Sequence, residues 1–484
     1  MTTYIESLVA VLDRAGERPV LCHEGVDTTA AELLAVIYRY ARVLDGLGLG
    51  RGDLVALLAP NRPEALAVRY ATHLLGAGAV YLSVPPDPDI RARMIAQFDP
   101  RLVVVFPETA DLLPTVDAPV AAVGPVPGVA LRLDTPTSGA PLSCRARPED
   151  LAVVVSSGGT TGVPKGSRRD FATYTTMVAT PAAPQRRQLA NGKLAYLTQI
   201  LVDQTLLGGG AVILQDGYEP VATLAAIERE RITDLFLVEP QLFALMDHPA
   251  VPDFDLSSLH ALTHIGAMAA PVLRRRGRER LGPVVAHTYG ASEMGIVSAL
   301  SPAEHDRPSR FRCAGRIRAG VEVRFRHPDG TLDPRTGAIE VRSPAMAQGY
   351  RHRPVEEAEH FVDGWYQTGD LGALDDEDML CILGRVTDVD PFGVSPVDLQ
   401  DALCATPSVR YAVLLADPEH DVRIAAVEAW PGGAVDVEQC RVALAGRAVQ
   451  LLPVDRMPLT EQGKPNRPAL RAAALDQVRF TSSV

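Results

Sequence analysis

The hydrophobic positions of this chain follow helical spacing in some segments and strand-like spacing in others. Residues 28–47 repeat apolar side chains at the period of a helix that buries one face. Thr28 or Thr29 can cap the start of this helix, and Gly48 can end it. The same spacing predicts a second helix over Pro63–Leu75.

Short apolar runs separate these helical segments and predict buried strands. They occupy Leu54–Leu58, Val80–Val84, Leu102–Phe106, Leu151–Val155, Ala211–Leu214, Asp234–Val238 and Val284–His287. Because strands alternate with helices, we expect an α/β fold with parallel sheets covered by helices.

The pattern changes in the last third of the chain. From Cys313 to Val341, polar and apolar residues alternate between turn sequences (HPDG, PRTG), which predicts a small β subdomain. Residues 389–484 contain strands and helices of their own, and we expect them to form a small, mobile α+β domain. The large N-terminal domain would then span residues 1–387.

Composition and charge narrow the function classes. The formal net charge is −12, from 47 basic and 59 acidic residues, which argues against nucleic acid or an anionic membrane as the main partner. No apolar run approaches the roughly 18 residues of a membrane span, and the first residues lack the pattern of a secretory signal. The six cysteines form no CxxC pair, which is typical of reduced thiols. We therefore expect a cytoplasmic enzyme.

Lysine is rare in this chain. Lys165, Lys193 and Lys464 are its three lysines, so arginine supplies the other 44 of the 47 basic residues. Where arginine serves as the general surface cation, a remaining lysine can mark a site that needs a compact ammonium group.

The segment with the clearest chemistry is Val153–Ser167, with the sequence VVVSSGGTTGVPKGS. A buried strand leads into small and hydroxylated residues and then into Pro164, Lys165 and Gly166. Glycines let backbone N–H groups approach a polyanion, hydroxyls add donors, and the lysine adds positive charge. The segment is not a Walker A loop, because Pro164 stands in place of its second glycine. These features predict a phosphate-binding loop of another kind.

This loop resembles the phosphate loop of the adenylate-forming ligase superfamily, which includes acyl- and aryl-CoA synthetases, firefly luciferase and nonribosomal peptide adenylation domains. Its doubled glycine is most similar to that of the aryl-acid activating members. Other signatures of the superfamily follow in the same order along nearly the whole chain. They are Gly76–Val84, Thr288–Gly295, Gly337–Tyr350, Tyr366–Gly372, Gly384–Asp388 and Pro458–Arg467.

The resemblance implies an AMP-forming acid–thiol ligase. A small carboxylic acid attacks the α-phosphate of ATP with Mg²⁺, which gives an acyl-adenylate and pyrophosphate. A thiol of CoA or of phosphopantetheine on an acyl carrier protein then displaces AMP. The resemblance also favours a monomer or homodimer and a place in secondary metabolism, the latter by analogy alone.

The resemblance assigns roles to individual residues. Tyr289 would face adenine beside Gly290, Ser292 would donate to a phosphate, and Glu293 would be both a catalytic residue and the Mg²⁺ ligand. The residues expected to cradle the β- and γ-phosphates are Ser157, Gly158, Gly159, Thr160, Thr161 and Lys165, the last also as a catalytic cation.

Two further positions complete the expected nucleotide site. Asp370 would accept hydrogen bonds from both ribose hydroxyls, and Arg385 would support the ribose or the α-phosphate. Lys464 lies between Gly463 and Pro465, where a protruding loop is natural. In the superfamily this lysine reaches the α-phosphate and the carboxylate when the C-terminal domain swings about a hinge acid.

The hinge acid is Asp388 by this resemblance, and the segment that follows departs from the family pattern. Asp388–Pro396 is slightly shorter and more acidic than usual, with Asp390 and Pro391 in place of an apolar–basic pair. In CoA ligases this loop enters the site for thioester formation. The change either affects that step, points to a different acceptor, or is a harmless deletion.

The expected acyl pocket also departs from its relatives. Leu194–Leu214 is shorter than the corresponding segment, and Asp203 within it can pair with a substrate amino group or be a capping or exposed acid. Small residues at Gly266, Ala267 and Ala291 leave room for a flat acyl group. We therefore expect an aromatic or compact acid.

Other functions fit the sequence less well than an acid–thiol ligase. A serine hydrolase would need G-x-S-x-G, which the sequence around Ser292 lacks. A catalytic zinc is not expected either, because the sequence contains no Cys/His cluster that could bind it. The basic run Arg274–Arg280 is expected to be a solvated helix face. The remaining alternative is a superfamily member with altered chemistry. It would use only a preformed acyl-adenylate, activate a non-carboxylic acid, transfer to a non-thiol acceptor, or bind an adenylate without catalysis.

Overall fold

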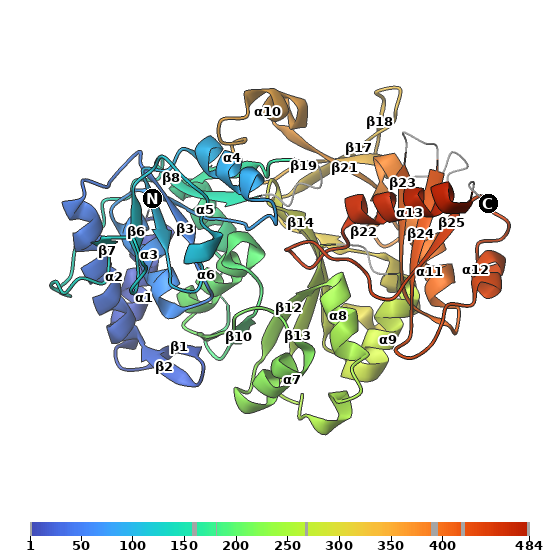
Figure 1. Cartoon of the computed structure of the whole chain (residues 1–484), viewed down its shortest axis with the longest axis horizontal. Helices are drawn as coiled ribbons and strands as arrows, with labels where there is room; N and C mark the ends of the chain where they lie inside the picture. Colours follow the sequence, from blue (N-terminus) through green and yellow to red (C-terminus); the bar gives the residue numbers. More distant parts are fainter. Residues whose placement is uncertain are drawn as a thin grey trace.

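The computed structural model describes residues 2–156, 162–180, 182–266, 270–388, 395–417 and 422–481, without the side chains of 306 and 477–481. The molecule is elongated, with the first elements of the chain at one end and the last at the other (Figure 1). Two large sheets and one small sheet form its framework.

The N-terminal sheet has seven strands in the order β7-β6-β5-β3-β4-β8-β9. Their bounds are β3 Leu54–Leu58, β4 Gly78–Tyr81, β5 Leu102–Val105, β6 Val120–Ala122, β7 Leu131–Arg132, β8 Leu151–Ser156 and β9 Gly166–Asp170. All neighbours are parallel except β8 and β9. The first five α-helices are α1 Tyr4–Ala15, α2 Ala30–Gly46, α3 Pro63–Leu74, α4 Pro88–Phe98 and α5 Phe171–Val178.

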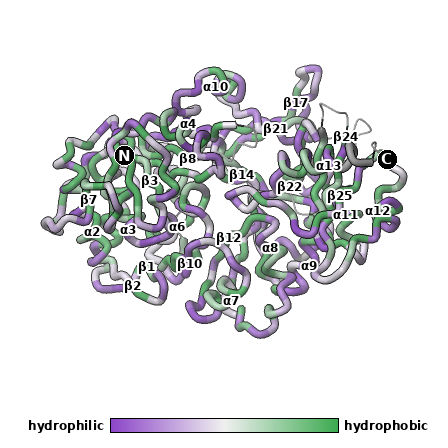
Figure 2. The backbone as a smooth tube through the Cα atoms, viewed as in Figure 1, coloured by the Kyte–Doolittle hydropathy of each residue, from purple (hydrophilic) through white to green (hydrophobic). Residues whose placement is uncertain are grey.

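Both faces of this sheet are buried. Along β3, Val55 and Leu57 belong to one hydrophobic cluster, whereas Ala56 and Leu58 belong to another on the opposite face. A strand buried on both faces reads as a continuous apolar run, which is why this strand was predicted with its observed bounds. Figure 2 shows the same contrast, with hydrophobic strands inside the sheet and a hydrophilic tip on the β17–β18 hairpin.

The second large sheet has fifteen strands and runs through the centre of the molecule. Its first part contains β1 Pro19–His23, β2 Val26–Thr29, β10 Arg187–Ala190, β11 Ala211–Leu214, β12 Asp234–Val238, β13 Ala261–Ile265 and β14 Val285–Ala291. These strands are parallel apart from the β1–β2 pair. The helices of this region are α6 Gln199–Leu207, α7 Pro220–Arg229, α8 Glu239–Met246 and α9 Pro271–Leu281.

The strands that follow extend the same sheet in antiparallel order. They are β15 Gly295–Leu300, β16 Gly315–Ile317, β17 Glu322–Arg326, β18 Leu332–Asp333, β19 Thr336–Arg342, β20 Phe361–Val362, β21 Trp365–Leu374 and β22 Met379–Arg385, with α10 Pro354–His360 inserted. The hairpin of β14 and β15 joins the two parts. The predicted β subdomain therefore exists, but it continues the central sheet, and the sheets of this α/β fold are of mixed orientation.

The C-terminal lobe, residues 395–481, has its own three-stranded sheet. It contains β23 Val409–Asp417, β24 Val422–Ala429 and β25 Gln450–Val454, with α11 Pro396–Cys404, α12 Val437–Ala443 and α13 Arg467–Thr481. This lobe packs directly on the central region, where the rings of Phe243 and Tyr411 lie 5.1 Å apart. The expectation that this lobe is a separate domain, and that it swings about residue 388, stays a prediction.

Local signals gave several element bounds correctly. Thr29 caps α2, because its side chain accepts a hydrogen bond from the backbone N–H of Glu32. The strand expected over Val80–Val84 instead ends at Tyr81, because the chain then leaves the sheet. The backbone N–H of Val84 donates to Glu461 of the C-terminal lobe at 2.6 Å, a contact that no local pattern contains.

The basic run at residues 274–280 is only in part the solvated helix face that the sequence suggested, with Arg275 and Arg280 exposed. Arg274 is only 2% exposed and donates to the carbonyl of Cys313 at 2.7 Å. Arg276 pairs with Asp247 at 2.8 Å and donates to the carbonyl of Arg410 in the C-terminal lobe at 3.0 Å. The expectation was wrong for Arg274 and Arg276, because these two side chains fasten α9 to its neighbours.

Candidate active site

A cavity of about 1460 Å³ lies where the two large sheets meet the C-terminal lobe. Its lining includes the residues that follow the carboxyl ends of parallel strands β10, β12, β13 and β14, and the end of β8. In open α/β sheets, ligands bind at this edge, because the loops there carry the variable side chains. The C-terminal lobe contributes the loop of residues 458–467, which we call the lysine loop.

One wall of the cavity holds a carboxylate in a fixed position. Asp370 Oδ2 accepts a hydrogen bond from the Tyr289 hydroxyl at 2.6 Å, and its Oδ1 accepts one from Arg385 at 2.8 Å. Arg385 also donates to the Thr368 carbonyl at 3.1 Å, and Asp370 faces Arg385 across the β21–β22 pair. Burial, followed by the charge of Asp370, raises the pKa of Tyr289, so its hydroxyl stays a donor. The sheet thus presents a carboxylate in a fixed orientation to the cavity.

A second carboxylate, Glu293, lies on the turn between β14 and β15 and is 7% exposed. Its two oxygens accept hydrogen bonds from the Ser292 hydroxyl at 2.7 Å and the Tyr350 hydroxyl at 3.1 Å. Burial and the neighbouring Glu293 raise the pKa of Tyr350, which keeps that phenol protonated. A single carboxylate at a phosphate site suits Mg²⁺, because this ion is usually held by one or two carboxylates and takes its other ligands from waters and substrate phosphates. Glu293 would hold this ion.

Lys165 reaches the same wall from the end of the predicted phosphate loop. Its ammonium lies 3.2 Å from His360 Nε2 and 5.0 Å from the centre of the Tyr350 ring. Burial and the charge of Lys165 both lower the pKa of His360, which favours a neutral imidazole that accepts from the lysine. The predicted phosphate contacts Ser157, Gly158, Gly159, Thr160 and Thr161 lie outside the described residues.

Lys464 enters the cavity on the lysine loop. Backbone hydrogen bonds close this loop, including one of 2.7 Å from the N–H of Thr460 to the carbonyl of Lys464. Gly463 turns the chain with φ of +77°, and a Cβ on Gly266 would lie 2.9 Å from Lys464 Cε. Burial lowers the pKa of Lys464, while Glu293 and other carboxylate charge act in the opposite direction.

A further group of residues that line the cavity is apolar, and we call this group the apolar wall. Of the small residues expected there, Gly266 and Ala291 line the cavity, and Ala267 lies outside the described residues. Position 290 requires glycine for a structural reason, because a Cβ there would lie 2.4 Å from the carbonyl oxygen of Gly295 in the β14–β15 hairpin. The larger apolar side chains of this wall are Met177, Leu197, Ile200, Phe236, Val238 and Ile296.

Asp203 does not line the cavity, so its contact with a substrate amino group is wrong, and the alternative of a capping or exposed acid is wrong as well, because the residue is buried inside α6. The side chain is fully buried and forms an ion pair with Arg69, which is itself 1% exposed. The hydroxyls of Tyr70 and Tyr174 each donate to it at 2.6 Å, one to each oxygen. Both oxygens of this carboxylate are therefore engaged inside the protein.

Sequence reasoning missed several cavity residues. Lys193 lines the cavity, and its rarity was a signal that could have identified it. Glu461 on the lysine loop is half-buried, and burial raises its pKa, whereas the hydrogen bond from Val84 and the charge of Lys193 act to lower it. Tyr350 stands at the end of a quoted motif, but nothing local indicated its bond to Glu293.

The predicted hinge residue Asp388 is 8% exposed and ends the short helix η6 Val386–Asp388. It forms an ion pair with Arg467 at the start of α13. This pair joins the strand region that carries Arg385 to the helix that follows the lysine loop. The departing segment at residues 389–394 lies outside the described residues.

Comparison with known proteins identifies close similarity along the whole chain. The medium/long-chain-fatty-acid–CoA ligase FadD8 of Mycobacterium tuberculosis (strain ATCC 25618 / H37Rv) is 31% identical over 514 aligned residues, which cover 96% of this chain and 89% of that protein. The feruloyl-CoA synthase of an Amycolatopsis species is 28% identical, with coverage of 91% and 93%.

Among the described residues, no helix combines the length and hydropathy that a membrane crossing requires.

Solved structures agree with this similarity. The amide bond synthetase McbA from Marinactinospora thermotolerans superimposes with a TM-score of 0.86 at 31% identity, covering 97% of this chain and 99% of that one. The anthranilate CoA ligase AuaEII superimposes with a TM-score of 0.89 at 21% identity, covering 100% and 98%, and supports the fold. Residues 9–351 match the family model described as AMP-binding enzyme. The chain belongs to this family and thus to the adenylate-forming superfamily of AMP-forming ligases.

Proposed function

We propose that this protein activates an aromatic or compact carboxylic acid with ATP and Mg²⁺ and then transfers the acyl group to the thiol of CoA or of phosphopantetheine. The observation that carries the proposal is the position of Lys464, which lies inside the cavity within electrostatic reach of Glu293 and Asp370. A cation at this point can stabilise the negative charge that develops when a carboxylate attacks the α-phosphate.

The fixed residues of the polar wall have distinct tasks in the first step. Asp370, held by Tyr289 and Arg385, is ready to accept from the two ribose hydroxyls without reorganisation. Mg²⁺ would supply charge neutralisation on the phosphates, with Glu293 as its protein ligand. Lys165 adds a cation at the end of the phosphate loop. Pyrophosphate then leaves, and the acyl-adenylate remains between Lys464 and the apolar wall.

The apolar wall supports the choice of acid. Ile200, Phe236 and Ile296 offer flat and branched surfaces suited to an aromatic or compact acyl group. Relatives named for aromatic acids include the feruloyl-CoA synthase and the indoleacetate–CoA ligase of Aromatoleum aromaticum, which is 27% identical over 92% of this chain. Their names concern those proteins, and for this chain the acid is a proposal.

A second candidate differs in the acceptor. The amide bond synthetase shares 31% identity with this chain over nearly its full length, and the segment after Asp388 departs from the pattern of CoA ligases. An amine would then attack the acyl-adenylate carbonyl, expel AMP and lose a proton to form an amide. Transfer to a thiol and transfer to an amine share the first half-reaction.

Pyrophosphate exchange into ATP tests the shared half-reaction. The panel comprises aromatic, short-chain, medium-chain and amino acids with Mg²⁺, and the Lys464→Ala variant is the control. Exchange that depends on one acid class and on Lys464 is the expected result. CoA, a phosphopantetheinylated carrier protein and simple amines are then offered with that acid, and the acyl product is identified by mass spectrometry. A folded protein that binds ATP but exchanges with no carboxylic acid would contradict the proposal.

A further inference from the structure

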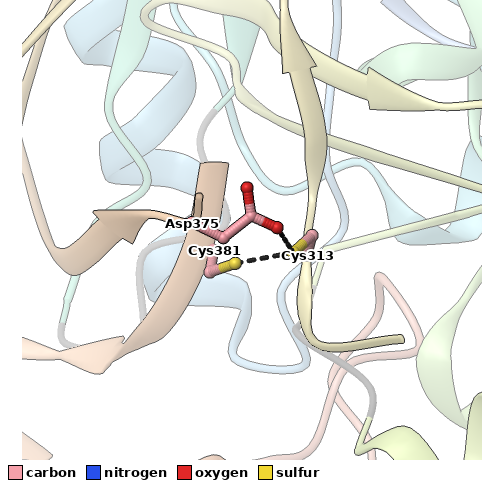
Figure 3. Close-up of side chains that lie close together, drawn as sticks. All are labelled: Cys313, Asp375 and Cys381. Carbon is pink, nitrogen blue, oxygen red and sulfur yellow. Dashed lines mark hydrogen bonds between the residues drawn. The ribbon is translucent and has the colours of Figure 1, made fainter. Parts of the chain in front are cut away.

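Two cysteines and an aspartate meet outside the cavity, on the antiparallel part of the central sheet (Figure 3). Cys313 follows the short helix η5 Pro308–Arg312 and precedes β16, Cys381 lies on β22, and Asp375 lies in the turn between β21 and β22. The two sulfur atoms are 2.7 Å apart, and Cys313 Sγ donates to Asp375 Oδ2 at 3.3 Å. The nucleotide site uses none of these three side chains.

The two thiols have different environments. Cys313 is 1% exposed, whereas Cys381 is partly exposed. The hydrogen bond between the two sulfur atoms lowers the pKa of Cys381, and the positive charges of Arg274 and Arg312 act in the same direction, against burial and the charge of Asp375. The same hydrogen bond, together with burial, raises the pKa of Cys313. Cys381 is therefore the thiol of the pair that ionises more readily, and it is also the more exposed of the two.

The arrangement fits sulfur–sulfur chemistry better than a metal. Two thiolates bound to one zinc ion at about 2.3 Å are kept well over 3 Å apart by tetrahedral geometry. Asp375 Oδ1 is already used, since it accepts from the backbone N–H groups of Glu377 at 2.9 Å and Met379 at 2.8 Å. Arg274 places a further positive charge near both sulfurs, which disfavours a cation.

We propose that Cys313 and Cys381 form a reversible intramolecular disulfide with a small-molecule disulfide as oxidant. The Cys381 thiolate attacks one sulfur of the oxidant RSSR, breaks its S–S bond and releases RS⁻. Cys313 then gives up its proton, by way of Asp375 or water, and its sulfur attacks the mixed disulfide at Cys381. The second RS⁻ leaves. Two protein thiols are oxidised, and RSSR is reduced to two thiols.

The bond would lie at the base of the C-terminal lobe. Arg312, the residue before Cys313, pairs with Asp398 and Asp401 on α11. Strand β22, which carries Cys381, continues to Arg385 and to the predicted hinge. A disulfide here would join the segment that anchors α11 to β22, the strand that carries Arg385. The redox state of the two thiols would then affect how firmly the C-terminal lobe is attached to the central sheet.

The test equilibrates the full-length protein with reduced and oxidised glutathione in a series of ratios, traps free thiols by alkylation, and digests with trypsin without reduction. The expected product is a peptide of residues 313–316 joined to one of residues 352–385, lighter by two hydrogen atoms and released by dithiothreitol. The oxidised protein should also melt several degrees higher than the reduced one, because the bond closes a long loop.

Single variants test the order of attack. In Cys313→Ser, glutathione should accumulate on Cys381 as a mixed disulfide, whereas in Cys381→Ser the buried Cys313 should stay unmodified. Cys144→Ser, which changes another partly exposed cysteine, should still form the linked peptide. Absence of the linked peptide at every ratio would overturn the proposal. Zinc bound to the reduced protein in stoichiometric amount, released only when these two cysteines are replaced, would overturn it as well.

Discussion

The polar and apolar walls of the cavity are built on different principles. On the polar wall, Asp370 and Glu293 each have both oxygens held by named donors. On the apolar wall, side chains such as Ile200 and Phe236 belong to the same residue types as the protein core. The comparison teaches that the side chains proposed to recognise the nucleotide are fixed by directional bonds. The side chains proposed to select the acid are fixed by packing, which includes packing against residues outside the cavity lining.

The largest expected effect concerns what lies behind the apolar wall. Replacing Asp203 with Ala leaves Arg69 buried without its counter-charge and leaves two tyrosine hydroxyls without an acceptor. We expect a loss of about 3–5 kcal/mol in the free energy of unfolding, measured by urea denaturation. The exposed Asp117→Ala should stay within about 0.5 kcal/mol of the wild type. If the Asp203→Ala variant were as stable as the wild type but preferred a different acid, Asp203 would be a substrate-binding residue and the structural role would be wrong.

The next effect is on catalysis at the polar wall. We expect Lys464→Ala to lower the rate of acid-dependent pyrophosphate exchange about 10²–10³-fold, because the developing charge loses its cation. Binding of ATP, measured by calorimetry, should persist. Lys193→Ala is the matched control, since it removes another lysine of the same cavity and should cost less than about tenfold. Equal losses in both variants would mean that Lys464 has no special role.

Asp370→Asn should weaken nucleotide recognition. The amide keeps the shape but loses the charge that Arg385 and the ribose hydroxyls share, and hydrogen bonds to charged groups contribute about 1.5–3 kcal/mol. We expect the KM for ATP to rise about 10–100-fold while the KM for the acid changes little. The exposed Asp378→Asn serves as control. A selective rise in the KM for the acid would contradict the assignment of this wall to the nucleotide.

The protonation of Lys464 gives a pH dependence with a definite sign. Burial lowers its pKa from the ordinary value of 10.5, and the ammonium form exists only below the pKa. The adenylation rate should therefore fall as pH rises through that lowered pKa, at a lower pH than for an exposed lysine. In Lys464→Arg, any residual activity should persist to higher pH, because a guanidinium stays charged. Identical alkaline limbs in pH–rate profiles of the two proteins would show that another group sets the decline.

The smallest effect sharpens the account of the apolar wall. Ile200→Val removes one buried methylene, which is worth about 0.8 kcal/mol, or roughly fourfold in relative kcat/KM. We expect this shift between two acids that differ by one methylene group, with the KM for ATP unchanged. A change in the KM for ATP would show that the two walls are not separate in function.

The same contrast explains how much the sequence could predict. The run Leu54–Leu58 and the Thr29 cap depend on local chemistry, and both were predicted correctly. The resemblance pointed to Asp370 and Arg385, which do lie together at the cavity, whereas their roles toward the nucleotide stay predictions. The roles of Asp203 and Arg274 were missed, since their partners lie far away in the sequence. The antiparallel extension of the central sheet was missed for the same reason, because strand order is a tertiary property.

The scarcity of lysine has a practical consequence. All three lysines line the same cavity, and the other 44 basic residues of the chain are arginines. Guanidinium groups stay protonated and react poorly with acylating reagents, so an amine-directed label on this chain reports on the cavity and on the terminal amine. A lysine-reactive fluorophore or crosslinker would therefore be site-directed without engineering, and ligands of the cavity could be found by the labelling that they prevent.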